Sequence, residues 1–473
     1  WREGMSAPAE PPGERGRRDL GDLISQLVIE TYKTLPKSGK PNAGEWTILA
    51  GIVATRVKCK ASHEDHAPSP HSSLDPSELE FRLLSLATGN KCLGASKLRG
   101  DGRVLNDSHA EVLARRAFMS FLYSQVELFL EDDRHLCLLD RSSKLDQGAA
   151  SRLRLKHACQ LHLYVSQAPC GDASNFEIGE ANLEGGGGEA PAKRIKISTD
   201  EHRAVEISDN VNRTGAKTIG NEAAGRGESL LSIKPGRGDR TQSLSCSDKI
   251  ARWNVLGLQG ALLAQLMDPV YLRTVIVSEA TYSKAALSRA LHDRLVTIQD
   301  QISPPFILNE PSLLSSRISF PSSRESVEKA VLEAVGTQKR LQCNPAGSSV
   351  NWTAGKKSRW LSCEEAARGA SSQDGESEAT IGGTGFRLGT TKKSLGTDAS
   401  TSRISKLNLL RRHCQVLELN KSREVPCKGS AGRYISLKRS CEEYTKNRAV
   451  LFGAASPFHA WPVNDEALED FTA

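Results

Sequence analysis

The sequence contains no apolar run close to the roughly 20 residues that a membrane span needs, and its N-terminus has no signal-peptide core. Its eleven cysteines are an odd number and follow no repeating framework. These absences exclude a membrane-spanning protein and a disulfide-rich secreted domain. We therefore expect an intracellular protein, nuclear or cytoplasmic, whose thiols are free or bound to metal.

Aromatic residues are also scarce, at 5% of 473 residues, and hydrophobic residues reach only 38%. This composition indicates a folded core diluted by segments that do not fold. Two polar, low-complexity stretches, at about 178–232 and 364–400, match that description. We expect a disordered leader at 1–18 and a single domain at 19–473 that carries both stretches as inserts.

A strong excess of one charge sign is absent as well, because 63 Lys and Arg oppose 56 Asp and Glu, for a net charge of +7. An excess this small fits an anionic partner without requiring one, since it also serves solubility. The basic run Lys193-Arg194-Ile195-Lys196 is a candidate nuclear signal, although a solvated linker explains it equally well.

Hydrophobic periodicity predicts helices that alternate with strands along the ordered parts of the chain. Capping side chains at 106–108 open one helix, whose apolar stripe runs from Leu113 to Phe129. The alternation indicates an α/β domain built of layered helices and strands. The other helices are expected at 19–34, from Asp248 through Leu266, at 284–297, at 402–422 and at 436–452, and strands at 46–57, 80–88, 160–166 and 272–278.

Two short motifs carry side chains that suit a catalytic metal. His109-Ala110-Glu111 lies at a helix start, and Pro169-Cys170 ends a strand. Zinc accepts imidazole nitrogen and thiolate sulfur, and a catalytic site leaves a fourth position for water, whose pKa falls to about 7 on the metal. Glu111, two residues from a ligand histidine, is placed to carry the proton. Because positions i and i+2 do not share a helix face, His109 and Glu111 are expected to converge at the exposed first turn.

Each motif alone is weak evidence, because buried cysteines usually act as small hydrophobic residues. In their order along the chain, however, the motifs match the nucleobase-deaminase signature H-x-E…P-C-x-x-C. A helix start at Cys170 would also lower the pKa of its thiol and favour the metal-binding thiolate. Residues 171–173 are Gly-Asp-Ala, so the second cysteine of the signature is missing. Spacing alone does not identify the third protein ligand.

Three longer segments resemble the adenosine deaminase domain shared by the tRNA and double-stranded-RNA adenosine deaminases: LNDSHAEVLARR (105–116), PCGDAS (169–174) and SCSDKIARWNVLGLQGALL (245–263). The resemblance implies a cytidine-deaminase-like layered fold with a central mixed sheet flanked by helices and elaborated by C-terminal helices. It implies hydrolytic deamination of adenosine to inosine. It also implies that Zn2+ is bound by His109, Cys170 and Cys246, and that Glu111 is the proton carrier.

Shorter segments look like the tRNA-specific branch of this family: PCGDAS, RTGAK (213–217), KPGRGDRTQS (234–243) and GTTKK (389–393). That branch is implied to deaminate adenosine 37, next to the anticodon of alanine tRNA. Editors of double-stranded RNA carry separate RNA-binding domains upstream, and the residues before 46 are too few for one. An editor of double-stranded RNA, a non-catalytic RNA-binding relative and a free-nucleoside deaminase stay as alternatives, and no protein partner is evident.

The resemblance further implies a buried inositol hexakisphosphate beneath the active site. Such an anion needs Lys and Arg donors that converge in the interior, where cations without partners are costly. The alternative is a set of ordinary solvated charges, which a tryptophan and two tyrosines among the matching positions make less favourable. After Trp461, three uncharged residues replace charged residues of the family. The matching positions are Lys91, Asn106, Arg115, Arg116, Lys249, Arg252, Trp253, Gln259, Lys406, Tyr434, Lys438, Tyr444 and Arg448.

Overall fold

The computed structural model describes residues 12–58, 75–131, 137–142, 152–175, 217–219, 231–236, 239–335, 343–369, 374–421 and 432–473. The predicted insert at 178–232 lies outside these described residues except for 217–219 and 231–232, and the basic run at 193–196 lies wholly outside them. Within the described residues, no helix combines the length and the hydrophobicity that crossing a bilayer requires.

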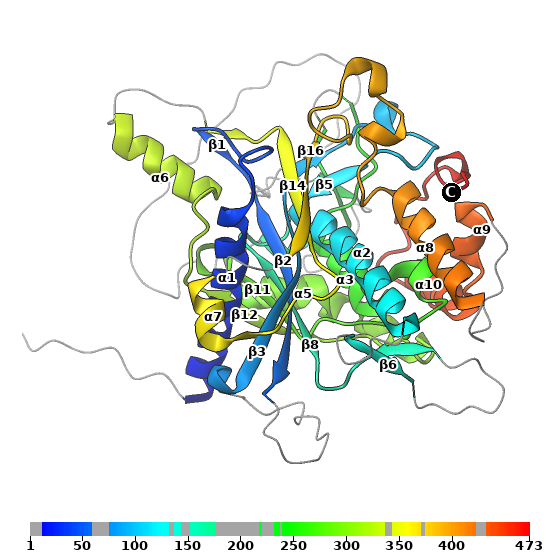
Figure 1. Ribbon diagram of the computed structural model, residues 1–473, viewed down its shortest axis with the longest axis horizontal. Helices are drawn as coiled ribbons and strands as arrows, with labels where there is room; N and C mark the ends of the chain where they lie inside the picture. Colours follow the sequence, from blue (N-terminus) through cyan, green and yellow to red (C-terminus); the bar gives the residue numbers. More distant parts are fainter. Residues whose placement is uncertain are drawn as a thin grey trace, which may run out of the picture.

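A mixed sheet of eight strands forms the centre of the protein and confirms the expected fold class (Figure 1). Its path is β12 (Ser312–Ser316), β11 (Thr274–Ser278), β8 (Gln160–Val165), β2 (Leu49–Val57), β3 (Leu79–Thr88), β14 (Ser348–Ala354) and β16 (Gly375–Ile381), with β15 (Leu361–Ser362) paired to β3. β8, β11 and β12 run parallel to one another, whereas the other neighbours are antiparallel. The central strands are apolar because helices cover both faces of the sheet.

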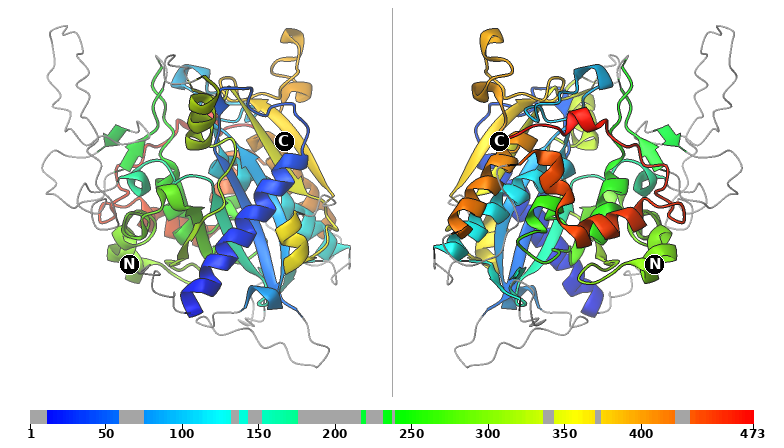
Figure 2. Two further views of the ribbon diagram at one scale, coloured as in Figure 1. Left: turned by 90° about the vertical axis from the view of Figure 1, so that its left-hand side faces the viewer. Right: turned by 90° about the vertical axis from the view of Figure 1, so that its right-hand side faces the viewer.

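Helices form a layer on each side of this sheet (Figure 2). α1 (Pro12–Thr34) and α7 (Cys363–Arg368) cover one face, and α2 (Ala110–Leu130) covers the other. α8 (Lys406–Lys421) packs on α2, so that α2 lies between the sheet and a further helix. The remaining α-helices of the described residues are α3 (Cys246–Leu256), α4 (Gly260–Leu263), α5 (Lys284–Leu291), α6 (Arg324–Val335), α9 (Tyr434–Arg439) and α10 (Glu442–Leu451).

The position of α2 determines where the site residues lie. Its predicted apolar stripe is in the core, and Phe118 and Phe121 are fully buried. Its N-terminus follows directly from β5 (Asp107–His109), which pairs antiparallel with β4 (Asn90–Cys92). Burial of the helix therefore places His109 and Glu111 inside the protein, beside the β4–β5 ribbon.

Short ribbons complete the fold around the sheet. β10 (Leu231–Ile233) pairs with β9 (Lys217–Ile219), and its chain also runs beside the segment that leads into α3, because the Ser245 N–H donates to the Ser232 carbonyl at 2.7 Å. This pairing brings the residues just after β10 next to the start of α3. The other ribbons are β1 (Glu45–Trp46) with β13 (Asn344–Pro345), and β6 (Leu139–Arg141) with β7 (Leu153–Leu155).

Two segments that were expected to be unfolded contain helices or strands where the structure describes them. Residues 12–18, which the composition placed in the leader, form the first turns of α1. The segment 364–400, expected as a low-complexity insert, contains most of α7 and the whole of β16, which pairs with β14 along its length. The first three side chains of β16 are exposed. Its polar composition is therefore that of an edge strand, where solvent covers the outward side chains.

Three predicted helices are interrupted. The helix expected from Asp248 through Leu266 ends at Leu256, because Gly257 has φ of 72°, a conformation that other residues rarely adopt. The helix expected at 284–297 ends at Leu291 and continues as the 3-10 helix η6 (Asp293–Gln301). The segment 436–452 is divided between α9 and α10. Periodicity located these apolar faces but not the turns that divide them.

Candidate active site

The structure brings together the three side chains that the sequence assigned to zinc. His109 ends β5 and precedes α2, Cys170 follows β8, and Cys246 is the first residue of α3. The His109 Nδ1 atom lies 3.5 Å from Cys246 Sγ and 3.9 Å from Cys170 Sγ. All three donor atoms lie within 4.8 Å of one another. Three residues far apart in the sequence thus form one cluster.

The spacing of these atoms fits a tetrahedral zinc ion. Zinc bonds of about 2.3 Å to sulfur and about 2.0 Å to nitrogen place a sulfur and a nitrogen ligand about 3.6 Å apart, close to the two observed separations. With one imidazole and two thiols, the protein supplies three ligands. A fourth position is left for water, as in catalytic rather than structural zinc sites.

Contacts between the two cysteine loops hold the thiols side by side. The Cys246 N–H at the start of α3 donates to Cys170 Sγ at 3.2 Å, and the Ser247 N–H donates to the Cys170 carbonyl at 3.1 Å. Gly171, with φ of 101°, permits this approach, because a Cβ there would lie 2.3 Å from Ser245 Oγ. The loops therefore pack backbone against backbone.

The pKa values of the two thiols shift in opposite directions. The contact with Cys246 lowers the pKa of Cys170, and the buried Lys234 ammonium acts in the same direction. Burial raises the pKa of Cys246, as does the adjacent Cys170. The expected lowering at Cys170 is present, but it does not come from a helix that starts at Cys170. Only the single 3-10 turn η3 (Asp172–Ser174) follows, and the donated N–H belongs to α3.

Glu111 lies in the first turn of α2 and is only 1% exposed. The expectation of an exposed first turn was wrong, because the β4–β5 ribbon and the residues after β10 surround it. The expected side-chain cap is also absent, and Asp107 Oδ1 instead accepts from the His109 N–H at 3.0 Å. Glu111 Oε2 is buried without a hydrogen-bond partner among the described residues, and burial raises the pKa of its carboxyl. A buried carboxyl with an unused oxygen suits proton transfer.

A buried lysine that the sequence reasoning missed lies next to the cysteines. Lys234 follows β10, and its side chain is wholly buried. Its Nζ atom lies 2.7 Å from Asp107 Oδ2 and 3.2 Å from Cys246 Sγ. Lys249 of α3 binds the same Asp107 oxygen. A lysine directly after the alternating Leu231-Ser232-Ile233 strand was the available signal, because a cation placed there requires a buried partner.

A cavity of about 500 Å³ adjoins the ion-pair network of Asp107, Lys234 and Lys249. It lies between α2, α3 and the C-terminal helices. Asp107 and Lys249 belong to the ion-pair network and also line the cavity, so they connect the two. Eight Lys and Arg but only three acidic side chains line it. Of the positions matched to inositol hexakisphosphate, the cavity is lined by Asn106, Arg115, Arg116, Lys249, Arg252, Trp253, Lys406, Tyr434, Lys438, Tyr444 and Arg448.

The charges in this cavity are poorly compensated. Arg115 Nε, Arg116 Nη2 and Arg252 Nε are buried without hydrogen-bond partners in the described part of the chain. Burial lowers the pKa of Arg115 to about 9, and the neighbouring Arg252 acts in the same direction. Burial likewise lowers the pKa of Lys406. A polyanion would supply the missing acceptors, so the residues fit the implied cofactor.

Two matched positions lie elsewhere. Gln259 is fully buried, but its amide accepts from the Val270 N–H and donates to the Leu256 carbonyl, which stabilises the turn after α3. Lys91 belongs to β4 and does not line the cavity. Conversely, Glu469, which the sequence reasoning did not identify, forms ion pairs with Lys406 and Lys438 there. Pro462, Val463 and Asn464 reach the cavity without adding a cation.

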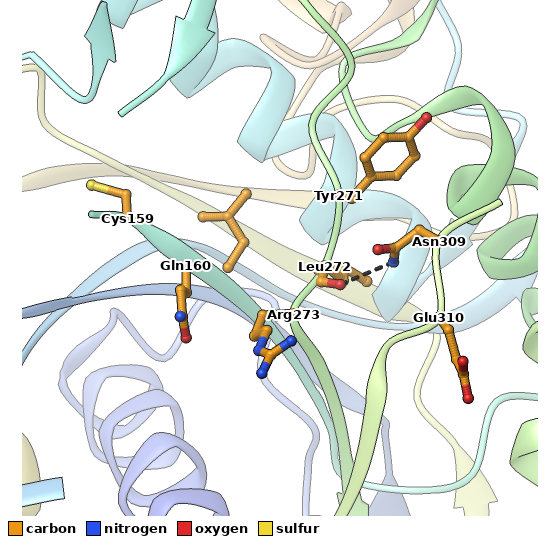
Figure 3. Close-up of a pocket in the computed structure, with 8 residues that line it drawn as sticks. Cys159, Gln160, Tyr271, Leu272, Arg273, Asn309 and Glu310 are labelled. Carbon is orange, nitrogen blue, oxygen red and sulfur yellow. Dashed lines mark hydrogen bonds between the residues drawn. The ribbon is translucent and has the colours of Figure 1, made fainter. Parts of the chain in front are cut away.

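A second, smaller cavity of about 200 Å³ lies at the N-terminal ends of β8 and β11, whereas Cys170 follows the C-terminal end of β8 (Figure 3). In Figure 3, Asn309 donates to the Leu272 carbonyl at 3.0 Å beside Arg273 and Glu310. None of its lining residues was predicted to bind metal, cofactor or substrate. This smaller cavity therefore has no part in the predicted chemistry.

Comparison with known proteins agrees with this geometry. A model of the adenosine-deaminase (editase) domain matches residues 85–465, a span that includes every residue of the zinc cluster. The chain is 30% identical to the tRNA-specific adenosine deaminase 1 of Homo sapiens, over 82% of this chain and 87% of the human protein. It is 38% identical to the Drosophila melanogaster protein of the same name, over 57% of this chain and 58% of that protein.

Double-stranded RNA-specific adenosine deaminase of Rattus norvegicus is also similar, with 31% identity over 64% of this chain but only 24% of the rat protein. The family model thus covers most of the chain, and the human relative aligns along most of its own length. The chain belongs to the adenosine-deaminase (editase) domain family.

Proposed function

We propose that the protein is a zinc-dependent hydrolase that converts adenosine to inosine in tRNA. One observation carries the proposal: His109, Cys170 and Cys246 form a three-ligand cluster beside the buried carboxyl of Glu111. An imidazole and two thiolates suit a catalytic zinc with an open position, and a glutamate that is not a ligand suits the proton transfers that deamination requires.

The reaction adds water to C6 of adenine and releases ammonia. Zinc at this site would supply an activated water close to neutral pH. Glu111 accepts a proton from the attacking water and passes it to N1 of the ring. It then takes the second proton, from the new hydroxyl on C6, and delivers it to the departing amino group, which leaves as ammonia. Its buried environment keeps bulk water away and keeps the carboxyl within reach of the ring. Lys234 holds Cys246 and Asp107 in place during these transfers.

A tRNA is the favoured substrate. The human relative named tRNA-specific aligns over 87% of its length, whereas the rat enzyme named for double-stranded RNA aligns over 24%. The PCGDAS and GTTKK segments support adenosine 37 of alanine tRNA as the target. An anticodon loop already displays unstacked bases, so extruding one costs less than opening a duplex. An intracellular location, nuclear or cytoplasmic, is part of this proposal, because the site requires two thiols that are not joined in a disulfide.

The test is incubation of the purified protein with total tRNA, followed by mapping of every new inosine. We expect inosine at one principal position, next to an anticodon, and slower conversion of a perfect RNA duplex at equal concentration. Faster conversion of the duplex would assign the protein to the double-stranded-RNA editors. RNA binding without inosine in either substrate would assign it to the non-catalytic relatives.

We also propose that the cationic cavity holds inositol hexakisphosphate. Arg115, Arg116 and Lys438 would bind its phosphates, and the compound would offset charges that otherwise repel one another inside the protein. Protein denatured after purification should release the compound in an amount equal to the chain, as measured by mass spectrometry. For protein stripped of it, adding back a 1,000-fold excess over the dissociation constant should stabilise folding by about 4 kcal/mol.

Inorganic phosphate at equal total phosphorus is the control ligand for this experiment, and Arg99→Met, which alters an exposed arginine outside the cavity, is the control variant. Arg116→Met should reduce the stabilisation, while Arg99→Met should leave it unchanged. Equal effects of phosphate and of the inositol compound would argue against a built site.

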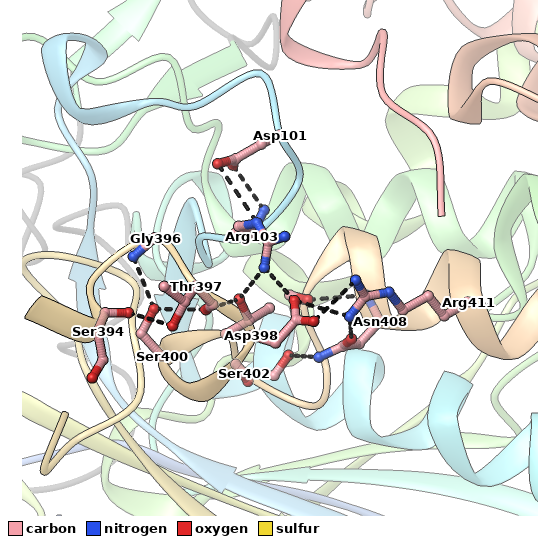
Figure 4. Close-up of polar contacts among 12 residues, drawn as sticks. Asp101, Arg103, Ser394, Gly396, Thr397, Asp398, Ser400, Ser402, Asn408 and Arg411 are labelled. Atoms are coloured by element: carbon pink, nitrogen blue, oxygen red, sulfur yellow. Dashed lines mark hydrogen bonds and ion pairs between the residues drawn. The ribbon is translucent and has the colours of Figure 1, made fainter.

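A projecting segment near the site supports contact with RNA away from the reacting base. Residues 383–401 pack beside the turn that follows β4, where Lys97 Nζ donates to the Gly383 carbonyl at 3.1 Å. Asp398 anchors the segment through ion pairs with Arg103 and Arg411 (Figure 4). The exposed lysines 392 and 393 form no ion pair with any described residue. We propose that this anchored segment presents both lysines to tRNA phosphates.

The double variant Lys392→Glu with Lys393→Glu should weaken tRNA binding and reduce the slope of log affinity against log salt by about 2, because each phosphate contact contributes roughly 1. The rate at saturating tRNA should change little, since neither lysine reaches the base. Binding titrations at several salt concentrations measure the slope. Lys329→Glu on α6 is the control, and an equal loss with that variant would reject a local contact.

A further inference from the structure

An aspartate follows each predicted cysteine ligand at the same spacing. Asp172 lies two residues after Cys170, and Asp248 lies two residues after Cys246. Both aspartates are buried, at 7% and 0% exposure. Neither belongs to the cluster of donor atoms. Each therefore requires a reason to be buried next to a metal site.

Asp248 is bound by an arginine, by β10 and by the residue that precedes Cys246. Arg294 Nη1 lies 2.8 Å from Asp248 Oδ1, and both side chains are almost wholly buried. The other carboxylate oxygen accepts from the Ser232 N–H at 3.0 Å and from Ser245 Oγ at 2.7 Å. This carboxylate thus joins β10, and with it the segment that carries Lys234, to the residue just before Cys246.

Asp172 is held in an equivalent way. Arg289 Nη2 lies 3.1 Å from Asp172 Oδ1. The same guanidinium donates to the Asp172 carbonyl at 3.2 Å and to the Asn175 carbonyl at 3.0 Å. One arginine therefore fixes both the side chain and the backbone of the loop that follows Cys170.

Both arginines come from a single segment. Arg289 belongs to α5 and Arg294 to η6, which follows it after one residue. α5 packs against both η3 and α3, the two elements that follow the cysteines. A buried ion pair rarely stabilises a fold more than apolar residues of the same size would. Two ion pairs from one continuous segment, each next to one cysteine loop, indicate a geometric role.

We propose that residues 284–301 act as a clamp, in which Arg289 and Arg294 are positioning residues that set the separation of the two zinc-binding thiols. The inference rests on the proposed zinc site. The arginines do not touch the metal or the substrate. They act through Asp172 and Asp248, which orient the loops that carry Cys170 and Cys246, as outer partners of metal ligands commonly do.

The experiment compares Arg289→Met and Arg294→Met with Arg82→Met in the full chain. Arg82 is also buried, more deeply than Arg289, but it binds Ser358 and the Lys356 carbonyl, away from Cys170 and Cys246. Two readouts are taken on folded protein: the rate of zinc release to a chelator, and the absorption spectrum of the cobalt-substituted protein. Arg289→Met and Arg294→Met should weaken zinc binding about 10- to 100-fold and alter the cobalt spectrum. Arg82→Met should lower stability and leave both readouts unchanged.

Arg289→Lys should restore part of the zinc affinity, because a lysine retains one charged donor for Asp172. Arg289 is 31% exposed, so the fold should tolerate its replacement. The Arg289 variants therefore test the proposal even if Arg294→Met does not fold. Unchanged zinc release and an unchanged cobalt spectrum in folded Arg289→Met would overturn the clamp. A wild-type protein that binds neither metal would instead overturn the proposed function, so the two failures are distinguishable.

Discussion

Replacement of Glu111 by glutamine should lower the rate of inosine formation by about 10²- to 10⁴-fold, the usual contribution of a proton-transferring side chain. Glutamine has almost the same shape but cannot accept or release the proton. Because Glu111 is not among the three metal-binding residues, zinc content and thermal stability should stay near the wild-type values. Single-turnover kinetics with a tRNA substrate, together with metal analysis of the same sample, measures both quantities.

The matched control is Glu127→Gln on the same helix. Glu127 forms an ion pair with Arg412 at 3.0 Å on the side of α2 that contacts α8, away from the zinc cluster. That variant should retain nearly full activity with slightly lower stability. If Glu111→Gln converted adenosine at a rate comparable to that of Glu127→Gln, another group would have to carry the proton.

Replacement of Lys234 by methionine should destabilise the fold by roughly 3–5 kcal/mol, the usual cost of removing one partner of a buried ion pair. The change leaves Lys249 as the one ammonium bound to Asp107 among the described residues and removes the ammonium next to Cys246. The positive charge of Lys234 favours the thiolate form of Cys170, so zinc affinity should fall as well. Denaturant unfolding and competition with a chelating dye measure the two effects.

Lys249→Met provides the comparison for this prediction. Lys249 binds the same oxygen of Asp107, but its side chain is 17% exposed and it forms no hydrogen bond with a cysteine among the described residues. Its replacement should therefore cost less stability and leave zinc affinity close to that of the wild type. A larger loss of zinc affinity with Lys249→Met than with Lys234→Met would contradict the assigned role of Lys234.

The sequence predicted the part of the site whose residues lie in short contiguous motifs. His109 and Glu111 are two residues apart, and Cys170 directly follows a proline. These spacings were enough to suggest the chemistry of the three residues. Cys246 lies 76 residues beyond Cys170, and only resemblance to a family assigned it. No local rule connects two cysteines at that distance, because the sheet and α3 bring them together.

The supporting residues were harder to predict. Asp107 was interpreted as a helix cap, but α2 starts after His109 and the carboxylate instead binds two lysines. Lys234 directly follows the strand β10, and nothing in that local pattern identifies Asp107 or Cys246 as its partners. Burial of a charged side chain depends on partners from distant elements, and periodicity records only which face is apolar.

The fold was predictable where apolar faces were long and regular, as in β3 and α2. It was less predictable where a polar segment is structured by its neighbours. β16 is polar and sits at the sheet edge, and it is ordered because β14 provides hydrogen-bond partners along its whole length. Similarly, Gly257 interrupts a continuous apolar pattern through its backbone conformation alone.

The most direct test of the zinc site is X-ray absorption at the zinc edge on purified wild-type protein, combined with metal analysis. We expect one zinc per chain, with two sulfur neighbours at about 2.3 Å and the remaining nitrogen or oxygen neighbours at about 2.0 Å. Cys246→Ser should leave one sulfur neighbour or no bound zinc. A folded protein without stoichiometric zinc, or a zinc with no sulfur neighbours, would contradict the joining of His109, Cys170 and Cys246 around one metal ion.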